Sequence, residues 1–373
     1  MNNKKYDIVV YGATGFTGQL VCEYLSSHDE IDKVNWAIAG RNIERLNLIS
    51  EKYSNVDIIH ASSDDPNSLD EMCVQAKLIL TTVGPYDLYG EPLINSCINN
   101  KSHYVDLTGE PQFVHRMVDK YNNKAIEQNV AIVNCCGFES IPPDVGTYHS
   151  VKQLKSKSIE VNYFLQTRGT ISGGTWASFL NSIISKQPII KIRSTTKNKK
   201  KAKKLYYNKD LGKWAMIFPV IDKQIVMRSS KSSSQYGENF NFNEYMLSKS
   251  YMRLIVLLLG IISVSFLAKF KIFRNWLISL RPSGSGPNKE QRENNWFKAT
   301  IIAKGNSKTI TTIIKGKDPG YGETSKFISE MALCIILDYD KLNSSSGFLT
   351  PVQCSKGLLI ERLRKAGISI ASS

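Results

Sequence analysis

Three glycines near the start of the chain, Gly12, Gly15 and Gly18, have the spacing of a turn that binds phosphate. Glycine lets the backbone approach a pyrophosphate, whose charge is stabilised by the unpaired N–H groups at a helix N-terminus. The apolar residues 8–10 before the glycines are typical of a buried parallel strand, and a helix is expected over residues 16–25. We therefore predict a dinucleotide site in Gly12-Ala13-Thr14-Gly15-Phe16-Thr17-Gly18, against the alternative of a tight turn without a ligand.

The residues after the second expected strand select the dinucleotide. An acidic side chain there would bind the ribose 2′-hydroxyl of NAD, whereas an arginine accommodates the 2′-phosphate of NADP. Gly40 is followed by Arg41 and Asn42, and the first carboxylate is Glu44. We therefore predict NADP in preference to NAD; a surface position at a helix start is the alternative for Arg41. Four residues near the ends of later strands complete the predicted cofactor site: Asp64, Val83, Gly84 and Pro85.

Hydride transfer also needs a proton donor close to the carbon that is reduced. Three loops beyond the carboxyl ends of the expected strands can reach that carbon, over residues 84–91, 106–110 and 137–144. Tyr86 is the first catalytic candidate, because a phenol can protonate a carbon or an oxygen while it polarises the substrate. Four weaker candidates, for which a cap or a structural hydrogen bond is the alternative, are Asp87, Tyr89, Glu110 and Glu139.

A doubly wound parallel sheet is needed to position these residues. Over the first 135 residues, strand and helix patterns alternate with short connections, which predicts a Rossmann domain over residues 1–150. Strands are expected at 34–39, 56–60, 78–83, 104–107 and 130–133, and a helix at 43–52.

Longer strand-like runs such as 158–166 and 298–314 predict a second domain of mixed α and β structure over residues 151–345. Residues 346–373, with a helix near 357–366, are expected to pack back on the first domain.

The composition limits the class of protein. The 373 residues are 42% hydrophobic and carry a formal net charge of +15, with much of the excess in the basic run 186–213. Such a run is either a solvated loop or a segment attracted by an anionic surface. Seven scattered cysteines without a C-x-x-C pair indicate neither a metal site nor a disulfide framework. Because the first apolar run is already a strand rather than a signal peptide, we expect synthesis in the cytosol and no secretion.

Residues 252–270 contain the most apolar stretch of the chain. Its central fourteen residues, 254–267, would form a helix of about 21 Å, which is short against a hydrocarbon core of about 30 Å. Arg253, Lys269, Lys271 and Arg274 flank the stretch. Together with the basic run, this predicts peripheral or monotopic association with an anionic membrane or a lipid droplet, and no nucleic acid. A buried core helix is the alternative.

Several longer motifs resemble the saccharopine dehydrogenase-like oxidoreductases, and within them the trans-acting enoyl reductases. They are Val83-Gly-Pro-Tyr-Asp-Leu-Tyr-Gly-Glu-Pro-Leu93, His103-Tyr-Val-Asp-Leu-Thr-Gly-Glu110, Gly137-Phe-Glu-Ser-Ile-Pro-Pro-Asp144, Gly173-Gly-Thr175 and Asp318-Pro-Gly-Tyr-Gly-Glu-Thr324. The resemblance implies a Rossmann domain, a second α/β domain and reduction of lipid-type substrates, without implying activity on saccharopine. The chain departs from the family at Gly284-Ser-Gly-Pro287, where an acidic Gly-Glu-Gly-Pro is expected.

These observations predict an NADPH-dependent oxidoreductase that acts on a lipid or lipid-linked substrate, such as an enoyl C=C bond, in lipid or glycolipid metabolism. One alternative is an NADPH-binding sensor or scaffold without catalysis. Another is the short-chain dehydrogenase mechanism with Tyr148 and Lys152, although chance explains this Tyr-x-x-x-Lys match and the one at Tyr245 and Lys249. A homodimer is left open.

Overall fold

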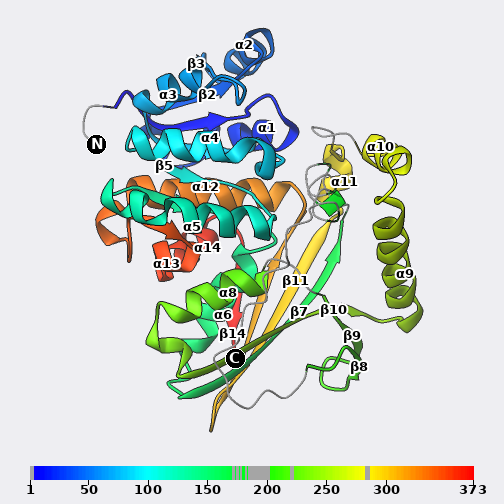
Figure 1. The fold of residues 1–373 in the computed structure, drawn as a ribbon. Coiled ribbons are helices and arrows are strands. Elements are labelled where there is room, and N and C mark those ends of the chain that lie inside the picture. Colours follow the sequence, from blue (N-terminus) through cyan, green and yellow to red (C-terminus); the bar gives the residue numbers. More distant parts are fainter. Residues whose placement is uncertain are drawn as a thin grey trace.

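A parallel sheet carries the first domain in the computed structural model, which describes residues 4–169, 173, 176, 179–180, 183, 202–218, 222–281 and 286–373 (Figure 1). Within these residues, its seven strands are β1 (Tyr6–Tyr11), β2 (Trp36–Gly40), β3 (Asp57–His60), β4 (Ala76–Thr81), β5 (His103–Val105), β6 (Ala131–Val133) and β13 (Gly347–Leu349). Their order is β13-β6-β5-β4-β1-β2-β3, so the first six follow the doubly wound order in which a nucleotide binds beyond the strand ends. Ile8, Val9 and Val10 are fully buried, as a parallel strand covered on both faces requires.

Helices cover both faces of this sheet. On one face, α1 (Phe16–Ser26), α2 (Ile43–Lys52) and α12 (Gly322–Leu337) pack against the inward side chains of β1, such as Ile8 and Val10. On the other face lie α3 (Pro66–Gln75), α4 (Tyr86–Asn99) and α5 (Pro111–Glu127), which contact Val9 and its neighbours. The predicted alternation of strands and helices is therefore present, and it places the loops after β1, β4, β5 and β6 at one edge.

The second sheet is mixed. In the described part of the chain it has seven strands, which are β7 (Ser158–Arg168), β8 (Leu205–Asn208), β9 (Lys213–Ile217), β10 (Asn239–Ser248), β11 (Trp296–Lys304), β12 (Thr309–Gly316) and β14 (Ser369–Ser372). Their order is β14-β12-β11-β7-β10-β9-β8, and only the β7–β10 pair is parallel among the pairs of the described strands. The helices α6 (Ile141–Val151) and α8 (Asp222–Lys231) pack on the face that is turned toward the first domain.

The long strand-like run predicted over residues 298–314 is a hairpin. β11 and β12 pair antiparallel from Phe297–Gly316 down to Lys304–Thr309. The reversal occurs at Gly305, Asn306 and Ser307, which are turn residues. Lys308 follows, and the apolar pattern resumes at Ile310, so the interruption is short enough for the two strands to be taken as one run.

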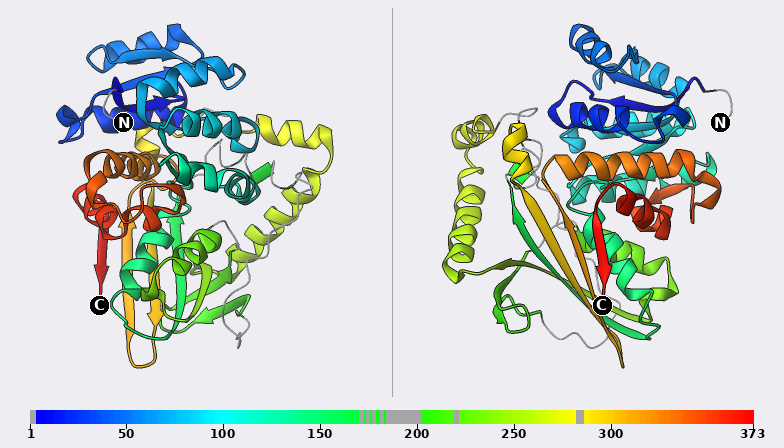
Figure 2. Two further views of the ribbon diagram at one scale, coloured as in Figure 1. Left: turned by 60° about the vertical axis from the view of Figure 1, so that its left-hand side comes forward. Right: turned by 180° about the vertical axis from the view of Figure 1, so that it is seen from behind.

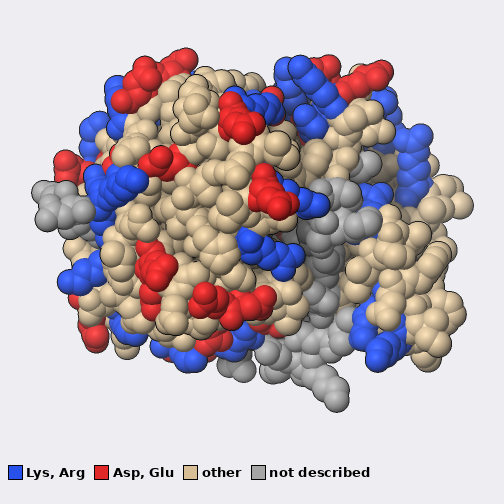
Figure 3. Space-filling view, turned by 90° about the horizontal axis from the view of Figure 1, so that it is seen from above, with Lys and Arg blue, Asp and Glu red and all other residues tan. Residues whose placement is uncertain are grey.

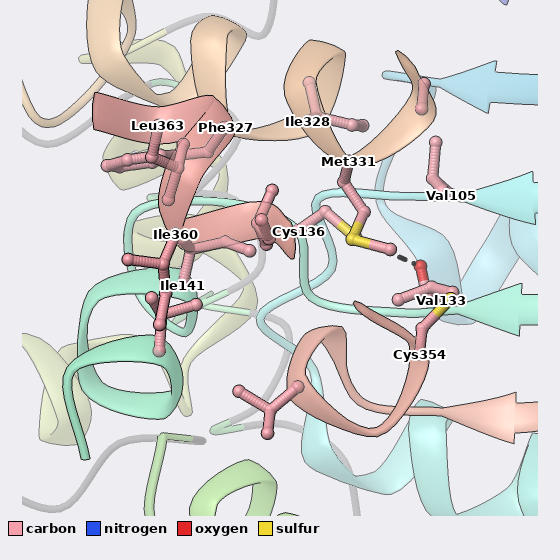
Figure 4. Packing of buried hydrophobic residues seen from close by; sticks show 14 of the residues in the cluster. Val105, Val133, Cys136, Ile141, Phe327, Ile328, Met331, Cys354, Ile360 and Leu363 are labelled. Carbon is pink, nitrogen blue, oxygen red and sulfur yellow. Dashed lines mark hydrogen bonds between the residues drawn. The ribbon is translucent and has the colours of Figure 1, made fainter. Parts of the chain in front are cut away.

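The C-terminal residues contribute to both domains. β13 extends the first sheet beside β6, α13 (Pro351–Ser355) and α14 (Gly357–Lys365) follow, and β14 joins the second sheet beside β12. Figure 4 shows the resulting core, in which side chains from β5, β6, α6, α12, α13 and α14 meet. The labelled residues are Val105, Val133, Cys136, Ile141, Phe327, Ile328, Met331, Cys354, Ile360 and Leu363.

Two further helices form an arm beside the second sheet (Figures 1 and 2). These are α9 (Tyr251–Leu267) and α10 (Lys271–Ser279), and we refer to residues 251–279 as the arm. Trp176 Nε1 donates a hydrogen bond of 2.6 Å to the Leu277 carbonyl oxygen and so fixes the inner side of the arm. None of the described helices is long and apolar enough to cross a membrane.

The remaining helices are short, and some predicted features lie outside the described residues. The short helices are α11 (Lys289–Glu293) and the 3-10 turns Ile31–Lys33, Ser234–Tyr236 and Tyr339–Lys341. Residues 186–201 of the basic run, two residues of the Gly173 motif and residues 284–285 of the departing motif fall outside the described residues.

Candidate functional site

The predicted glycine turn forms a tight strand-to-helix connection in which side chains have no room. Gly12 has a φ of +91°, and a Cβ placed there would lie 2.7 Å from Val83 Cγ2. A Cβ on Gly18 would lie 2.1 Å from the Gly12 carbonyl oxygen. The turn is closed by a hydrogen bond of 3.0 Å from the Gly15 N–H to that same oxygen. Glycine at these positions is therefore required by packing and by backbone conformation.

The start of α1 fits a phosphate. No side chain caps the helix at Gly15, and its first turn contains no acidic residue. The first N–H groups of a helix have no partner within the helix, and the helix dipole favours an anion there. The turn therefore fits the pyrophosphate of a dinucleotide, with Ala13, Thr14, Phe16 and Thr17 completing it.

The predicted ribose end lies beyond β2 and β3. Arg41 is exposed directly after Gly40. Burial raises the pKa of Tyr11, and the positive charge of Arg41 opposes this rise. Asp64 also acts on Tyr11, with the opposite sign, so both side chains lie near the same strand end. The Asn42 side chain caps α2 by accepting a hydrogen bond of 2.9 Å from the Arg45 N–H.

The Val83-Gly84-Pro85 segment follows β4 and lies beside the glycine turn. The Val83 side chain approaches Gly12, and the Thr82 hydroxyl donates a hydrogen bond of 3.2 Å to the Gly12 carbonyl oxygen. The structure therefore brings the predicted cofactor residues after β1 and β4 together at one edge of the sheet.

Tyr86, the first catalytic candidate, has its phenol engaged by the backbone. Its hydroxyl donates to the Thr81 carbonyl oxygen at 3.3 Å and accepts from the Leu107 N–H at 3.2 Å. The side chain is only 6% exposed, and burial holds the pKa of the phenol well above its usual value. These contacts favour a positioning role, in which Tyr86 joins the loops after β4 and β5, over proton donation.

Two of the weaker catalytic candidates also have structural partners. The Glu110 carboxylate accepts hydrogen bonds from the N–H groups of Tyr86 at 3.1 Å and Asp87 at 2.8 Å, so it caps α4 from a neighbouring loop. Asp87 forms an ion pair of 2.8 Å with Arg116 at the surface. Tyr89 is 37% exposed on α4.

Glu139 lies in the loop between β6 and α6. Gly137 provides the space for its carboxylate, because a Cβ there would lie 3.0 Å from Glu139 Oε2. The same loop is held by Asp106, which accepts hydrogen bonds from the N–H groups of Thr108 and Cys135 and from the Asn134 amide. Burial raises the pKa of Asp106 to about 6 despite these bonds.

Two buried carboxyls from the second domain lie close to this loop and were missed by the sequence analysis. Asp222 begins α8 and Glu244 lies on β10, and their side chains are hydrogen-bonded to each other. Asp222 is 3% and Glu244 5% exposed. The sequence signal for Glu244 was a carboxylate in line with Phe240 and Phe242 on the buried face of β10, whereas Asp222 had none.

The Tyr-x-x-x-Lys alternative does not fit the structure. Tyr148 lies within α6, 5% exposed, with its ring 6.4 Å from that of Tyr236 in the hydrophobic core. Lys152 follows the helix end, and its amino group lies over the Tyr148 ring at 5.9 Å. Tyr245 points to the other face of the second sheet and stacks on Phe164.

Known proteins resemble the chain in sequence and in structure. The family model "Saccharopine dehydrogenase NADP binding domain" matches residues 8–133. The chain is 31% identical to a saccharopine dehydrogenase-like oxidoreductase of Mus musculus, over 99% of this chain and 97% of the relative. It is 30% identical to a Mycobacterium tuberculosis protein named as a candidate trans-acting enoyl reductase, over 99% and 98% of the two chains.

Two further matches concern localisation and fold. A "Lipid droplet localized protein" of Caenorhabditis elegans is 31% identical over 93% of both chains. Apo saccharopine dehydrogenase (L-Glu forming) of Saccharomyces cerevisiae superposes with a TM-score of 0.55 over 99% of both chains, at 12% identity, which shows a shared fold.

Proposed function

The chain belongs to the saccharopine dehydrogenase-like oxidoreductases, and from this we propose that it is an NADPH-dependent reductase of a lipid or lipid-linked substrate with an enoyl C=C bond. Membership of this family indicates an oxidoreductase whose first domain binds NADP. The choice of a lipid substrate rests on the arm. The names of the mycobacterial and nematode relatives are in line with it.

The arm exposes an apolar surface that the rest of the described chain does not cover. In α9 only Leu254 is buried, and in α10 only Leu277. Ile272 is 83% exposed and Val256 64%. Other exposed apolar side chains of the arm are Met252, Leu259, Ile262, Phe266, Phe270, Phe273 and Trp276. This exposure argues against the buried core helix and for contact with lipid.

The chemistry of the arm fits an interface. Arg253, Lys269 and Lys271 are exposed beside the apolar side chains, and Figure 3 shows basic groups bordering the uncharged margin of the molecule on that side. Burial of one large apolar side chain contributes roughly 1.5–3 kcal/mol, so covering several of them contributes on the order of 10 kcal/mol before the cost of association. We infer that the arm lies on an anionic membrane or on a lipid droplet.

The first domain would hold NADPH by its own residues. The glycine turn and the N-terminus of α1 would bind the pyrophosphate, and Arg41 would bind the 2′-phosphate. When bound, NADPH supplies a hydride at its nicotinamide ring. The residues after β4, β5 and β6 lie beyond the carboxyl ends of the strands, where a substrate of such a sheet is bound.

Isotope transfer tests the reductase. NADPH labelled at the transferred hydrogen is incubated with the protein and a lipid extract, and label in the lipid fraction is measured. We expect label in lipid with wild type and none with protein whose cofactor turn carries Gly18→Ala. Cofactor binding without label transfer would refute the reductase and support the NADPH sensor.

Vesicle flotation tests the arm. The variant Ile272→Asp/Phe273→Asp is compared with Leu48→Asp/Val74→Asp, which changes two exposed apolar side chains on α2 and α3. With phosphatidylcholine–phosphatidylserine vesicles, we expect wild type and the control to float and the arm variant to remain unbound. If both variants floated equally, the arm would not be the part of the protein that binds lipid.

A further inference from the structure

Arg292 is a cation of the second domain that lies at the start of the cofactor helix α1. It belongs to α11, and its guanidinium carbon lies 5.6 Å from the centroid of the Phe16 ring, within the range of a cation–π contact. Phe16 is the first residue of α1 and directly follows Gly15 of the glycine turn. Figures 1 and 2 show α11 beside this part of the first domain. A positive charge of the second domain is therefore next to the turn that fits the pyrophosphate.

The Phe16 ring is the contact that joins this segment to the first domain. The edge of the Tyr321 ring, just before α12, packs against it with 4.7 Å between the ring centroids and an angle of 74° between the planes. On the α11 side, a Cβ on Gly286 would overlap the Phe16 ring. Glycine at this position therefore allows the chain that leads into α11 to approach α1 closely.

Arg292 is held in place by a rigid local structure. The Asn288 side chain starts α11 with a capping box. Arg292 Nη1 donates a hydrogen bond of 2.9 Å to the Pro287 carbonyl oxygen. Just beyond α11, Asn295 Nδ2 donates a hydrogen bond of 2.7 Å to Asp318 Oδ1, which ties this end of the helix to the loop before α12. The guanidinium is therefore positioned by its own helix and by the same loop that carries the Phe16 contact.

No ion pair among the described residues neutralises Arg292. Its hydrogen bond within the described chain goes to a backbone carbonyl, and the first turn of α1 contains no acidic residue. The Asp318 carboxylate on the adjoining loop accepts from Asn295 and from the N–H groups of Tyr321 and Gly322. A guanidinium is always charged, and a helix N-terminus is itself positive, so their proximity is unfavourable until an anion lies beside both.

We propose that Arg292 completes the pyrophosphate site, so that both domains hold the dinucleotide. The first domain contributes the glycine turn and the N-terminus of α1, and the second contributes the guanidinium. NADPH and NADH share the pyrophosphate, whereas the 2′-phosphate assigned to Arg41 is present in NADPH alone. The two arginines therefore act on different groups of the cofactor. This proposal rests on the NADP-binding first domain and not on the reduction of a lipid, so it applies equally to a reductase and to a sensor.

Titration calorimetry of NADPH and NADH tests this role in the full chain. Because the lost contact is a charge-assisted one, Arg292→Gln should raise the Kd of both cofactors by a similar factor, roughly 10–100-fold. Lys289→Gln is the matched control, since it removes the same charge from an exposed position of the same helix, and its Kd values should match those of wild type. Unchanged Kd values in Arg292→Gln, or a loss for NADPH alone, would overturn the proposal.

Three further measurements separate the charge of Arg292 from its packing on Phe16. Arg292→Lys keeps the charge and should recover most of the affinity, and the difference between wild type and Arg292→Gln should shrink as salt rises from about 0.05 to 0.5 M. The probe 2′-AMP has no pyrophosphate and should bind wild type and Arg292→Gln equally. A lower Tm of Arg292→Gln without cofactor, combined with equal losses in Arg292→Lys and no effect of salt, would show a packing role and overturn the proposal.

Discussion

Replacement of Arg41 by alanine should change the choice between NADPH and NADH. Arg41 is exposed directly after β2, and none of the ion pairs among the described residues includes it. Its removal therefore leaves no buried partner uncompensated, and the free energy of unfolding should be unchanged within about 0.5 kcal/mol. Arg41→Ala should therefore change the affinity for the cofactor without changing the stability of the fold.

The expected loss follows from hydrogen bonds to a charged group. Such bonds contribute about 1.5–3 kcal/mol, and 1.4 kcal/mol corresponds to a factor of about ten in an equilibrium constant. The Kd for NADPH should therefore rise by about 10–150-fold in Arg41→Ala. NADH carries no 2′-phosphate, so its Kd should stay within about twofold of the wild-type value.

Titration calorimetry of the two cofactors measures this difference. Arg45→Ala is the matched control, because it removes the same charge from an exposed position one turn along α2. Its Kd values should match those of wild type. The reasoning is refuted if Arg41→Ala weakens NADH as much as NADPH, or if Arg45→Ala reproduces the loss.

Three further substitutions test the cofactor turn, the Tyr86 phenol and a buried network of ion pairs, one each. Gly18→Ala places a Cβ against a backbone oxygen 2.1 Å away and should abolish NADPH binding and lower Tm, whereas Gly260→Ala, in open space, should do neither. Tyr86→Phe removes the hydrogen bonds of the phenol to the Thr81 carbonyl oxygen and from the Leu107 N–H, and it should cost about 1–3 kcal/mol in urea unfolding while kcat is retained. Loss of kcat with unchanged stability would restore the phenol as the acid. Arg362→Met removes the permanently charged partner of Glu330, a carboxylate that is 2% exposed and that keeps its contacts with the His28 ring and the Tyr24 hydroxyl. It should cost about 3–5 kcal/mol, against less than about 1 kcal/mol for Lys33→Met at a surface pair, and equal costs would contradict this.

The local pattern was enough to predict the cofactor turn. Gly12, Gly15 and Gly18 act through backbone conformation and close approach, which depend on residues only a few positions apart. Arg41 follows a strand of clear apolar pattern, so its place at the strand end could also be predicted. The hairpin of β11 and β12 could not be separated from a single run, because both strands share one alternation across a four-residue turn.

The predicted catalytic residues show where local pattern fails. Tyr86 and Glu110 were chosen because their loops lie beyond the strand ends, and the loops do lie there. What their side chains do was decided by partners 21 and 24 residues away, which take up the phenol and the carboxylate. Asp222 and Glu244 had no motif around them, since their pairing exists only once α8 packs on β10.

The sequence by itself determined that this chain begins with an NADP-binding domain and carries an apolar segment too short to span a bilayer. Those properties depend on backbone chemistry, charge and length, which neighbouring residues set. Only the tertiary structure decided that the apolar segment is exposed and that two carboxyls distant in sequence, Asp222 and Glu244, are buried. Exposure and pKa depend on which surfaces exclude water, and that is determined by packing between elements far apart in the chain.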